Sequence, residues 1–165
     1  MGPKEVGLLY VRKERIAAVW PNIVSVGWNQ DSLTASTAAR KFEVLGQRDD
    51  AAVAAVGTAV DFYRVIGYEN VEARVTQLAT ALREGLARIN KVKLVTPAGP
   101  NLSGGVVVLQ VSGFERQQMG ALTQELYTKY GVAGAATGGL RLCPHVYNTM
   151  ADVELAIRGV RELLA

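Results

Sequence analysis

A stripe of apolar residues at helical spacing gives way, near residue 90, to apolar runs typical of strands. The stripe returns every three or four positions, as the buried face of an amphipathic helix requires. Its members are Val71, Val75, Leu78, Leu82, Leu86 and Ile89. Residues 106–111 then form an apolar run rich in valine, which is typical of a central strand. The change of period predicts a long helix that packs on a sheet.

The remaining C-terminal segments complete a β-β-α-β-α order after this helix. Residues 92–96 and 140–142 are short strand candidates, and residues 119–130 carry apolar side chains at helical spacing. Thr149 can cap a last helix, with Asp152 three positions later in a capping-box-like arrangement. This order predicts an α+β fold in which helices cover one face of a small, mostly antiparallel sheet.

The first 45 residues contain too little predicted helix to form a core of their own. Residues 7–11 are a short apolar run that predicts a buried strand, and residues 23–26 predict a second strand. Residues 29–41 are polar and small, which predicts a loop. A strand this close to the N-terminus needs neighbours that the segment does not supply.

A helix is predicted to begin at Asp49 or Asp50, either of which can cap it, and to end at Gly67. The change in character near this point divides the chain into residues 1–45 and residues 46–165. We expect the second part to be a small domain together with its leading helices.

The composition excludes several classes of protein. With 49% apolar and 20% charged residues, the chain is not disordered as a whole. A net charge of +3, from 18 basic and 15 acidic residues spread along the chain, does not support nucleic-acid binding. One cysteine excludes a disulfide framework, one histidine excludes a multi-histidine metal centre, and no apolar run reaches the roughly 18 residues of a membrane span. We expect a cytoplasmic protein without a metal site.

Known catalytic motifs are scarce in this sequence. It has no nucleophile elbow, P-loop or dinucleotide-binding fingerprint. The glycine pairs at 104–105 and 138–139 are explained by turns. Arg40, Lys41 and Arg48 could form a weak anion-binding cluster, but the charge pattern favours a solvated loop.

Residues 137–149 hold the densest group of polar side chains. Arg141 lies between two leucines on a predicted strand, so its charge needs an anionic partner, which is either an internal carboxylate or a bound one. Cys143 is either a buried small residue or a nucleophile, and His145 is either a structural residue or a base. For all three residues, the pattern alone favours the structural interpretation.

Four stretches, taken in order, resemble the class V aminotransferases. These are fold-type-I pyridoxal-phosphate enzymes that include cysteine desulfurases, kynureninase and isopenicillin N epimerase-like proteins. The stretches are residues 2–11 (Gly-Pro-Lys-Glu-Val-Gly-Leu-Leu-Tyr-Val), residues 40–47 (Arg-Lys-Phe-Glu-Val-Leu-Gly-Gln), residues 50–90, and residues 139–149, which end in Tyr-Asn-Thr. The resemblance spans nearly the whole chain.

The resemblance implies that the chain is the C-terminal part of such an enzyme. The family's Schiff-base lysine would precede Met1, so Lys4 is not assigned that role. The large domain, with the cofactor's aspartate partner and stacking aromatic residue, would also be absent. Residues 1–45 would then be a remnant of that domain, with residues 7–11 as its left-over strand. We therefore expect the chain to bind no pyridoxal phosphate and to be inactive alone.

Individual roles follow only where positions match the family's motifs. Arg141 matches the arginine that binds the α-carboxylate of the amino-acid substrate. Gly46 matches the glycine of a loop that reaches the cofactor phosphate of the neighbouring subunit, and Gln47 stands in place of the loop's threonine. This loop implies a homodimer. Residues 131–137 hold no cysteine, which disfavours desulfurase activity and favours the epimerase and aminotransferase branch.

A non-catalytic module that binds a small ligand or mediates dimerisation is the alternative function. Arg141 distinguishes the two hypotheses. An open site lined by His145 and Tyr147 would favour ligand binding, whereas an Arg141 paired with an internal carboxylate would favour a structural role.

Overall fold

The computed structural model describes residues 2–25, 28, 39–43, 46–99 and 102–165. It separates into two compact units, Met1–Val65 and Ile66–Ala165. Each unit is described by itself. Among the described residues, no helix is both long and apolar enough to cross a membrane.

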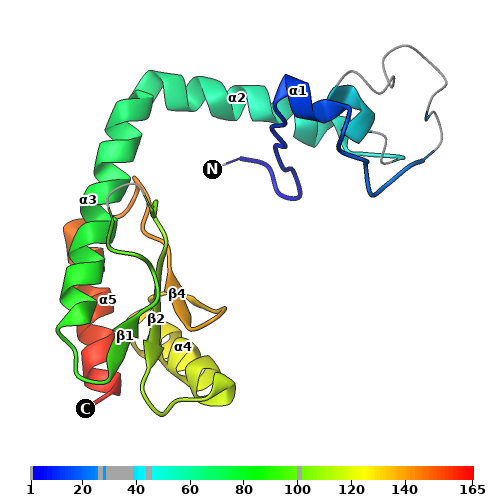
Figure 1. Ribbon diagram of the computed structural model, residues 1–165. Coiled ribbons are helices and arrows are strands. Elements are labelled where there is room, and N and C mark those ends of the chain that lie inside the picture. Colours follow the sequence, from blue (N-terminus) through cyan, green and yellow to red (C-terminus); the bar gives the residue numbers. More distant parts are fainter. Residues whose placement is uncertain (1, 26–27, 29–38, 44–45, 100–101) are drawn as a thin grey trace. The chain divides into compact units, whose positions relative to one another are not determined.

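The C-terminal unit contains three helices and a four-stranded sheet (Figure 1). In chain order its elements are α3 (Tyr68–Ala87), β1 (Val92–Leu94), β2 (Val107–Val111), α4 (Arg116–Tyr130), β3 (Ala135–Ala136), β4 (Leu140–Leu142) and α5 (Met150–Leu163). The strand order is β1-β2-β4-β3, and each neighbouring pair is antiparallel. The predicted α+β fold is confirmed, and β3 is a short strand that the sequence did not predict.

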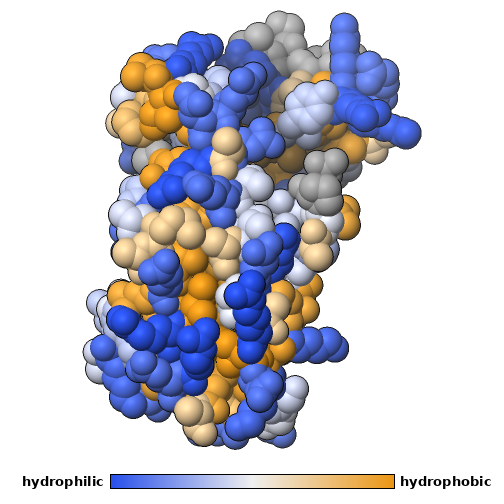
Figure 2. Space-filling model, turned by 90° about the vertical axis from the view of Figure 1, so that its left-hand side faces the viewer, coloured by the Kyte–Doolittle hydropathy of each residue, from blue (hydrophilic) through white to orange (hydrophobic). Residues whose placement is uncertain are grey.

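The core of this unit lies between one face of the sheet and the three helices. Along β2, Val107, Leu109 and Val111 are buried, and the side chains between them are more exposed. The stripe along α3 supplies Leu78, Leu82 and Leu86 to the same cluster. Alternation along the strands and helical spacing along α3 thus lead to one shared core. In Figure 2, hydrophilic side chains flank a narrow apolar strip where α3 and α5 lie.

The ends of the last two helices follow from local sequence. Gly131 ends α4 in the left-handed conformation, at φ 67°, which favours glycine. Thr149 caps α5, and its hydroxyl accepts from the Asp152 amide at 3.2 Å. The Asp152 carboxylate accepts in return from the Thr149 amide at 2.8 Å. The predicted cap and capping box are confirmed.

The N-terminal unit is built around helix α2 (Asp50–Ile66), which the sequence predicted. It also holds the short helix α1 (Lys13–Ile16) and the 3-10 turn η1 (Ala39–Glu43). The predicted buried strand over residues 7–11 is wrong. These residues form no strand, and Leu8 and Tyr10 are 86% and 85% exposed. A strand requires a partner for its backbone groups, and none of the described residues provides one there.

Two other predictions concern the same region. Residues 23–25 form no strand, and residue 26 lies outside the described residues. Most of the predicted loop over residues 29–41 also lies outside them. The compact units divide at 65/66, and the assignment of residues 1–45 to a remnant of a larger domain stays a prediction.

Candidate functional site

Arg141 lies on the face of the sheet opposite to the core. It is paired in register with Val108 of β2 and with Ala135 of β3. Its neighbours Leu140 and Leu142 are buried, whereas Arg141 is exposed, because successive side chains of a strand point to opposite faces. Arg141 forms no ion pair or hydrogen bond with any residue that the structure describes. Of the two partners that the sequence left open, an internal carboxylate is not found among the described residues, which leaves the guanidinium open to a ligand there.

A glycine allows β4 to lie beside β2. Gly139 has φ +141°, and a Cβ atom built on it would lie 2.2 Å from the carbonyl oxygen of Leu109. Any side chain would therefore push the two strands apart. Gly138, at φ +69°, completes the turn that leads into β4. The predicted turn role of this glycine pair is confirmed, and it places Arg141 opposite Val108.

The chain forms a closed turn immediately after β4. The Asn148 side-chain oxygen accepts from the His145 amide, and the Asn148 amide donates to the His145 carbonyl oxygen, both at 2.9 Å. The rings of His145 and Tyr147 are stacked, with centroids 5.1 Å apart. From α3, Arg74 donates to the Asn148 carbonyl oxygen at 3.0 Å, which ties the turn to that helix.

The His145 ring lies in the turn after β4, and its structural role stays a prediction because its hydrogen bonding is incomplete. Its ring is partly buried, and burial lowers the pKa of the imidazole below its ordinary value. Its Nδ1 atom is buried without a hydrogen-bond partner among the described residues. The burial of this ring therefore favours the neutral imidazole over the charged one.

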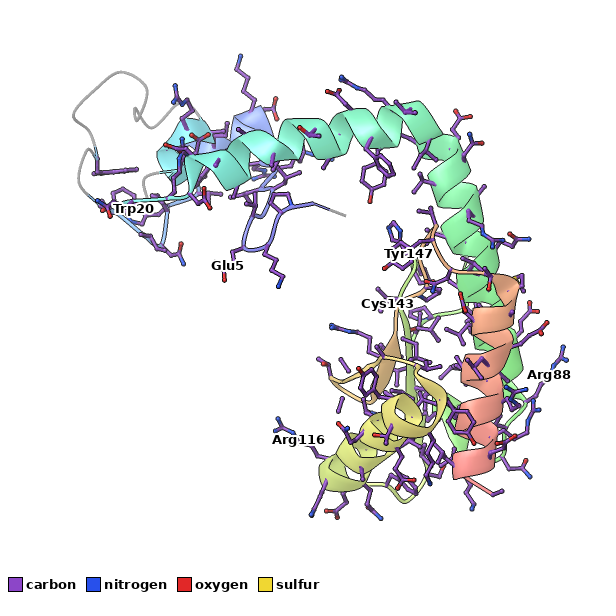
Figure 3. The ribbon with its side chains drawn as sticks, turned by 180° about the vertical axis from the view of Figure 1, so that it is seen from behind. Glu5, Trp20, Arg88, Arg116, Cys143 and Tyr147 are labelled. Carbon is purple, nitrogen blue, oxygen red and sulfur yellow. The ribbon has the colours of Figure 1, made fainter. Side chains whose placement is uncertain are left out.

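A cavity of about 360 Å³ adjoins the turn. Its lining includes Cys143, Tyr147, Asn148 and Asp152, and Figure 3 shows Cys143 and Tyr147 close together beyond the end of β4. Cys143 is a free, exposed thiol, so its predicted burial is wrong. The alternation of β4 explains this exposure, because Leu140 and Leu142 are buried while Arg141 and the following Cys143 are exposed. No motif in the sequence predicted this cavity.

Gly46 and Gln47 lie in the N-terminal unit and are both exposed. Gly46 has φ +92°, and a Cβ atom there would lie 3.3 Å from the Ser25 hydroxyl oxygen. The loop thus leaves the Gln47 amide groups available as donors to an anion. Arg141 belongs to the other compact unit.

The basic residues around this loop are not a free anion-binding cluster. Arg48 bonds to Asp50 at 2.8 Å, which raises the pKa of its guanidinium, and it lies 3.6 Å from Glu43. Arg40 also pairs with Glu43, at 3.7 Å. The prediction of a solvated loop is wrong for Lys41, which is 2% exposed and donates its Nζ hydrogen bond to the Ile16 carbonyl oxygen. The Lys41 Nζ atom also lies 5.2 Å from the centroid of the Phe42 ring.

A metal ion has no evident ligands in the part of the chain that the structure describes. No group of three or more His, Cys, Asp or Glu side chains converges there.

Comparisons with known proteins place these features in a family. A family model described as aminotransferase class-V matches residues 1–156. The probable cysteine desulfurase 2 of Mycobacterium leprae (strain TN) is 25% identical over 182 residues, which cover 99% of this chain and 42% of that protein. The isopenicillin N epimerase of Amycolatopsis lactamdurans is 27% identical over 177 residues, 99% of this chain and 44% of that protein. The chain spans less than half the length of these relatives.

Solved structures share the fold. The crystal structure of the cysteine desulfurase CsdA from Escherichia coli matches with a TM-score of 0.71 and 21% identity, over 99% of this chain and 43% of that chain. The apo structure of a cysteine desulfurase from Thermococcus onnurineus NA1 matches with a TM-score of 0.63 and 22% identity, over 93% of this chain and 42% of that chain.

Proposed function

Because this chain belongs to the class V aminotransferase family, we propose that it supplies the carboxylate-binding part of a pyridoxal-phosphate-dependent enzyme that acts on an amino acid. The observation that carries this proposal is the state of Arg141. Its guanidinium is exposed, stands on the open face of the sheet and has no partner among the described residues. An arginine in this position can accept a carboxylate in a bidentate arrangement.

Arg141 would orient the substrate rather than react with it. Two parallel N–H···O bonds fix both the position and the plane of a carboxylate. The rest of the amino acid is then held in one orientation, which converts a random encounter into a defined approach. Gly139 supports this role, because it lets β4 approach β2 closely enough to hold Arg141 in its register.

Pyridoxal phosphate would supply the electron sink for chemistry at the substrate's α-carbon. Gly46 and Gln47 fit a contact with its phosphate, since the loop is exposed and offers N–H donors. We assign no described lysine to covalent attachment of the cofactor. Lys41 is buried against Ile16, and the other described lysines are exposed. We therefore propose that the chain is inactive alone.

The proposed reaction subtype is epimerisation or amino-group transfer. Residues 131–137, which precede β4, contain no cysteine that could act as a sulfur acceptor. Cys143 follows Arg141 and adjoins the cavity beyond β4. The relatives include both cysteine desulfurases and an isopenicillin N epimerase, so this assignment depends on the loop rather than on overall similarity.

We also propose a cytoplasmic homodimer. The N-terminal unit leaves large apolar side chains uncovered, among them Leu8, Tyr10 and Trp20, which are 86%, 85% and 74% exposed. Exposed apolar groups of this size are typical of surfaces that bind another protein chain.

Carboxylate binding can be tested with two ligands that differ by one group. N-(5′-phosphopyridoxyl)-L-alanine carries a carboxylate, and N-(5′-phosphopyridoxyl)ethylamine has a hydrogen atom in its place. We expect the first to bind roughly tenfold more tightly in an NMR titration of the labelled chain, because of a charge-assisted bond to Arg141. Arg141→Ala should remove that difference, whereas Arg116→Ala, which changes an exposed arginine on α4 (Figure 3), should retain it. Equal affinities of the two ligands for the unaltered chain, or no binding of the ligand that carries the carboxylate, would contradict the proposal.

Inactivity of the chain alone has a separate test. The purified chain would be mixed with pyridoxal phosphate, reduced with borohydride and analysed by mass spectrometry. We expect no stoichiometric adduct on a single lysine. Such an adduct would overturn this part of the proposal, and Lys4 would be the first residue to substitute.

A further inference from the structure

The cavity beyond β4 is assembled from several elements of the C-terminal unit. Leu82 of α3, Leu142 of β4 and Val153 of α5 contribute apolar surface to it, and all three are buried. Its volume of about 360 Å³ is within the range of sites for small molecules. These walls favour a ligand with an apolar group.

The charge of the cavity has one sign. Asp152 is the only residue of the described lining with a formal charge, and no lysine, arginine or histidine is part of that lining. Hydrogen bonding from the Thr149 amide lowers the pKa of the Asp152 carboxyl, so it is ionised at neutral pH. The cavity therefore favours a cation and repels an anion.

One oxygen of this carboxylate is available to a ligand. The Thr149 amide and the Asn148 side-chain amide both donate to Oδ2, at 2.8 and 3.5 Å. The Thr149 side chain also hydrogen-bonds to this carboxyl, but the two amide donors leave Oδ1 uncontacted and the Asp152 side chain is exposed. An ammonium group could donate to this oxygen in a charge-assisted bond without disturbing the cap of α5.

Tyr147 provides a second feature suited to a cation. Its side chain is part of the cavity lining, and His145 stacks on its ring with the centroids 5.1 Å apart. The hydrogen bond from Arg74 to the Asn148 carbonyl oxygen holds the backbone turn that carries this ring. Aromatic rings attract cations at their faces, and a ring held by stacking loses less freedom when a ligand binds.

We propose that this cavity binds a small organic cation, namely a primary amine attached to an apolar group, with its ammonium on Asp152 and its apolar group against Leu82, Leu142 and Val153. The site has the opposite charge preference from the Arg141 face, where the ligand is an anion. It does not depend on the proposed enzymatic function, because none of its residues is assigned to cofactor or carboxylate binding.

Three ligands of one shape test the proposal. Benzylamine is a cation at neutral pH, benzyl alcohol is neutral and benzoate is an anion. In ¹H–¹⁵N NMR titrations of the full chain, we expect benzylamine to shift the amides of residues 131–133, 143, 145–148 and 152–156. Its affinity should exceed that of benzyl alcohol roughly tenfold, and benzoate should not bind there.

Two pairs of variants locate the site. Asp152→Asn keeps an oxygen for the Thr149 amide but removes the charge, and it should remove the preference for benzylamine over benzyl alcohol. Glu154→Gln removes an exposed carboxylate of the same helix outside the cavity lining and should leave the preference for benzylamine unchanged.

The second pair tests whether the ligands occupy the cavity. Ala133→Trp places a large side chain at an exposed part of the lining and should abolish binding of both ligands. Ala87→Trp, at an exposed position outside the lining, is its control.

Several outcomes would overturn the proposal. They are equal binding of benzylamine and benzyl alcohol, an unchanged preference in Asp152→Asn, shifts outside the cavity, and no binding of benzylamine at millimolar concentration. The spectrum of each unliganded variant shows whether it is folded. Glu154→Gln and Ala87→Trp must also bind as the unaltered chain does. Since Arg141→Ala should leave benzylamine binding intact, failure here is distinguishable from failure of the proposed carboxylate site.

Discussion

Arg74 of α3 donates a hydrogen bond of 3.0 Å from its Nη2 atom to the main-chain carbonyl oxygen of Asn148. The two residues are 74 positions apart in the chain. A second nitrogen, Nη1, donates to Gln77 at 2.7 Å and holds the guanidinium in place. This contact joins the first helix of the C-terminal unit to the turn that follows Arg141.

Arg74→Met should lower the free energy of unfolding by about 1 kcal/mol, because it removes one bond from a partly exposed charged donor and retains the apolar stem. Urea unfolding would measure this change. The Tyr147 ring signals should also move, since the turn loses its tie to α3. Arg116→Met, on the exposed start of α4, is the control and should leave both unchanged. A stable turn in Arg74→Met would show that the Asn148 and Asp152 bonds are sufficient.

Gly139→Ala should destabilise the chain by about 3 kcal/mol or more. The new Cβ atom would lie 2.2 Å from the Leu109 carbonyl oxygen, on a backbone at φ +141° that other residues rarely adopt. Gly120→Ala is the matched control. It lies within α4 with open space around its Cβ position, so alanine should stabilise the helix by about 0.5–1 kcal/mol. In urea unfolding, we expect the free energy of unfolding to fall in Gly139→Ala and to rise in Gly120→Ala. No change in Gly139→Ala would mean that β4 can move away from β2.

Two apolar runs of similar composition show what sequence patterns can establish. Residues 106–111 were predicted as a strand, and β2 covers Val107–Val111 with Leu109 fully buried. Residues 7–11 carry a similar local signal but form no strand, and Leu8 is 86% exposed. Local composition indicates only that the backbone of a segment tends to be extended. A strand also needs a neighbouring chain segment for its hydrogen bonds.

The candidate functional residues could likewise be predicted from the sequence only in part. The exposed position of Arg141 follows from alternation on β4, and the cap at Thr149 follows from its spacing to Asp152. The buried Lys41 bonds to Ile16, which lies 25 positions away, so no local sequence pattern predicts its burial. The cavity beyond β4 likewise joins segments distant in the chain, including Leu82 and Val153. Such sites arise from tertiary contacts.

Thr149→Ala should reduce the free energy of unfolding by about 1 kcal/mol, because the Asp152 amide would lose the hydroxyl that accepts its hydrogen bond. Thr149→Ser retains a hydroxyl in the same position and should restore most of this stability. Urea unfolding of the two variants measures the difference. If serine and alanine were equally destabilising, the methyl group rather than the cap would be responsible.

Asp152 should make stability depend on pH on the acidic side. The Thr149 amide lowers the pKa of its carboxyl below the ordinary value of 3.8, so the folded state favours the charged form. This contribution is present above the unfolded pKa and is lost as pH falls through the lower folded pKa. Asp152→Asn should flatten this part of the stability profile, and Glu154→Gln, on the exposed side of α5, should not. An NMR titration of the Asp152 carboxyl carbon would confirm the direction.

His145 should also make stability fall as pH falls, but in the range just below pH 6.5. Burial lowers the pKa of its imidazole below 6.5, so the folded state favours the neutral form. The unfolded chain then binds a proton first as pH falls below 6.5, and stability should decrease until pH reaches the folded pKa. Because His145 is the single histidine of the chain, its ring proton gives an unambiguous NMR titration. A midpoint at or above 6.5 would contradict this account. His145→Gln should remove this dependence of stability on pH. In the unaltered chain, the NMR signals of the Tyr147 ring should shift as the stacked imidazole gains its proton, and in His145→Gln they should not.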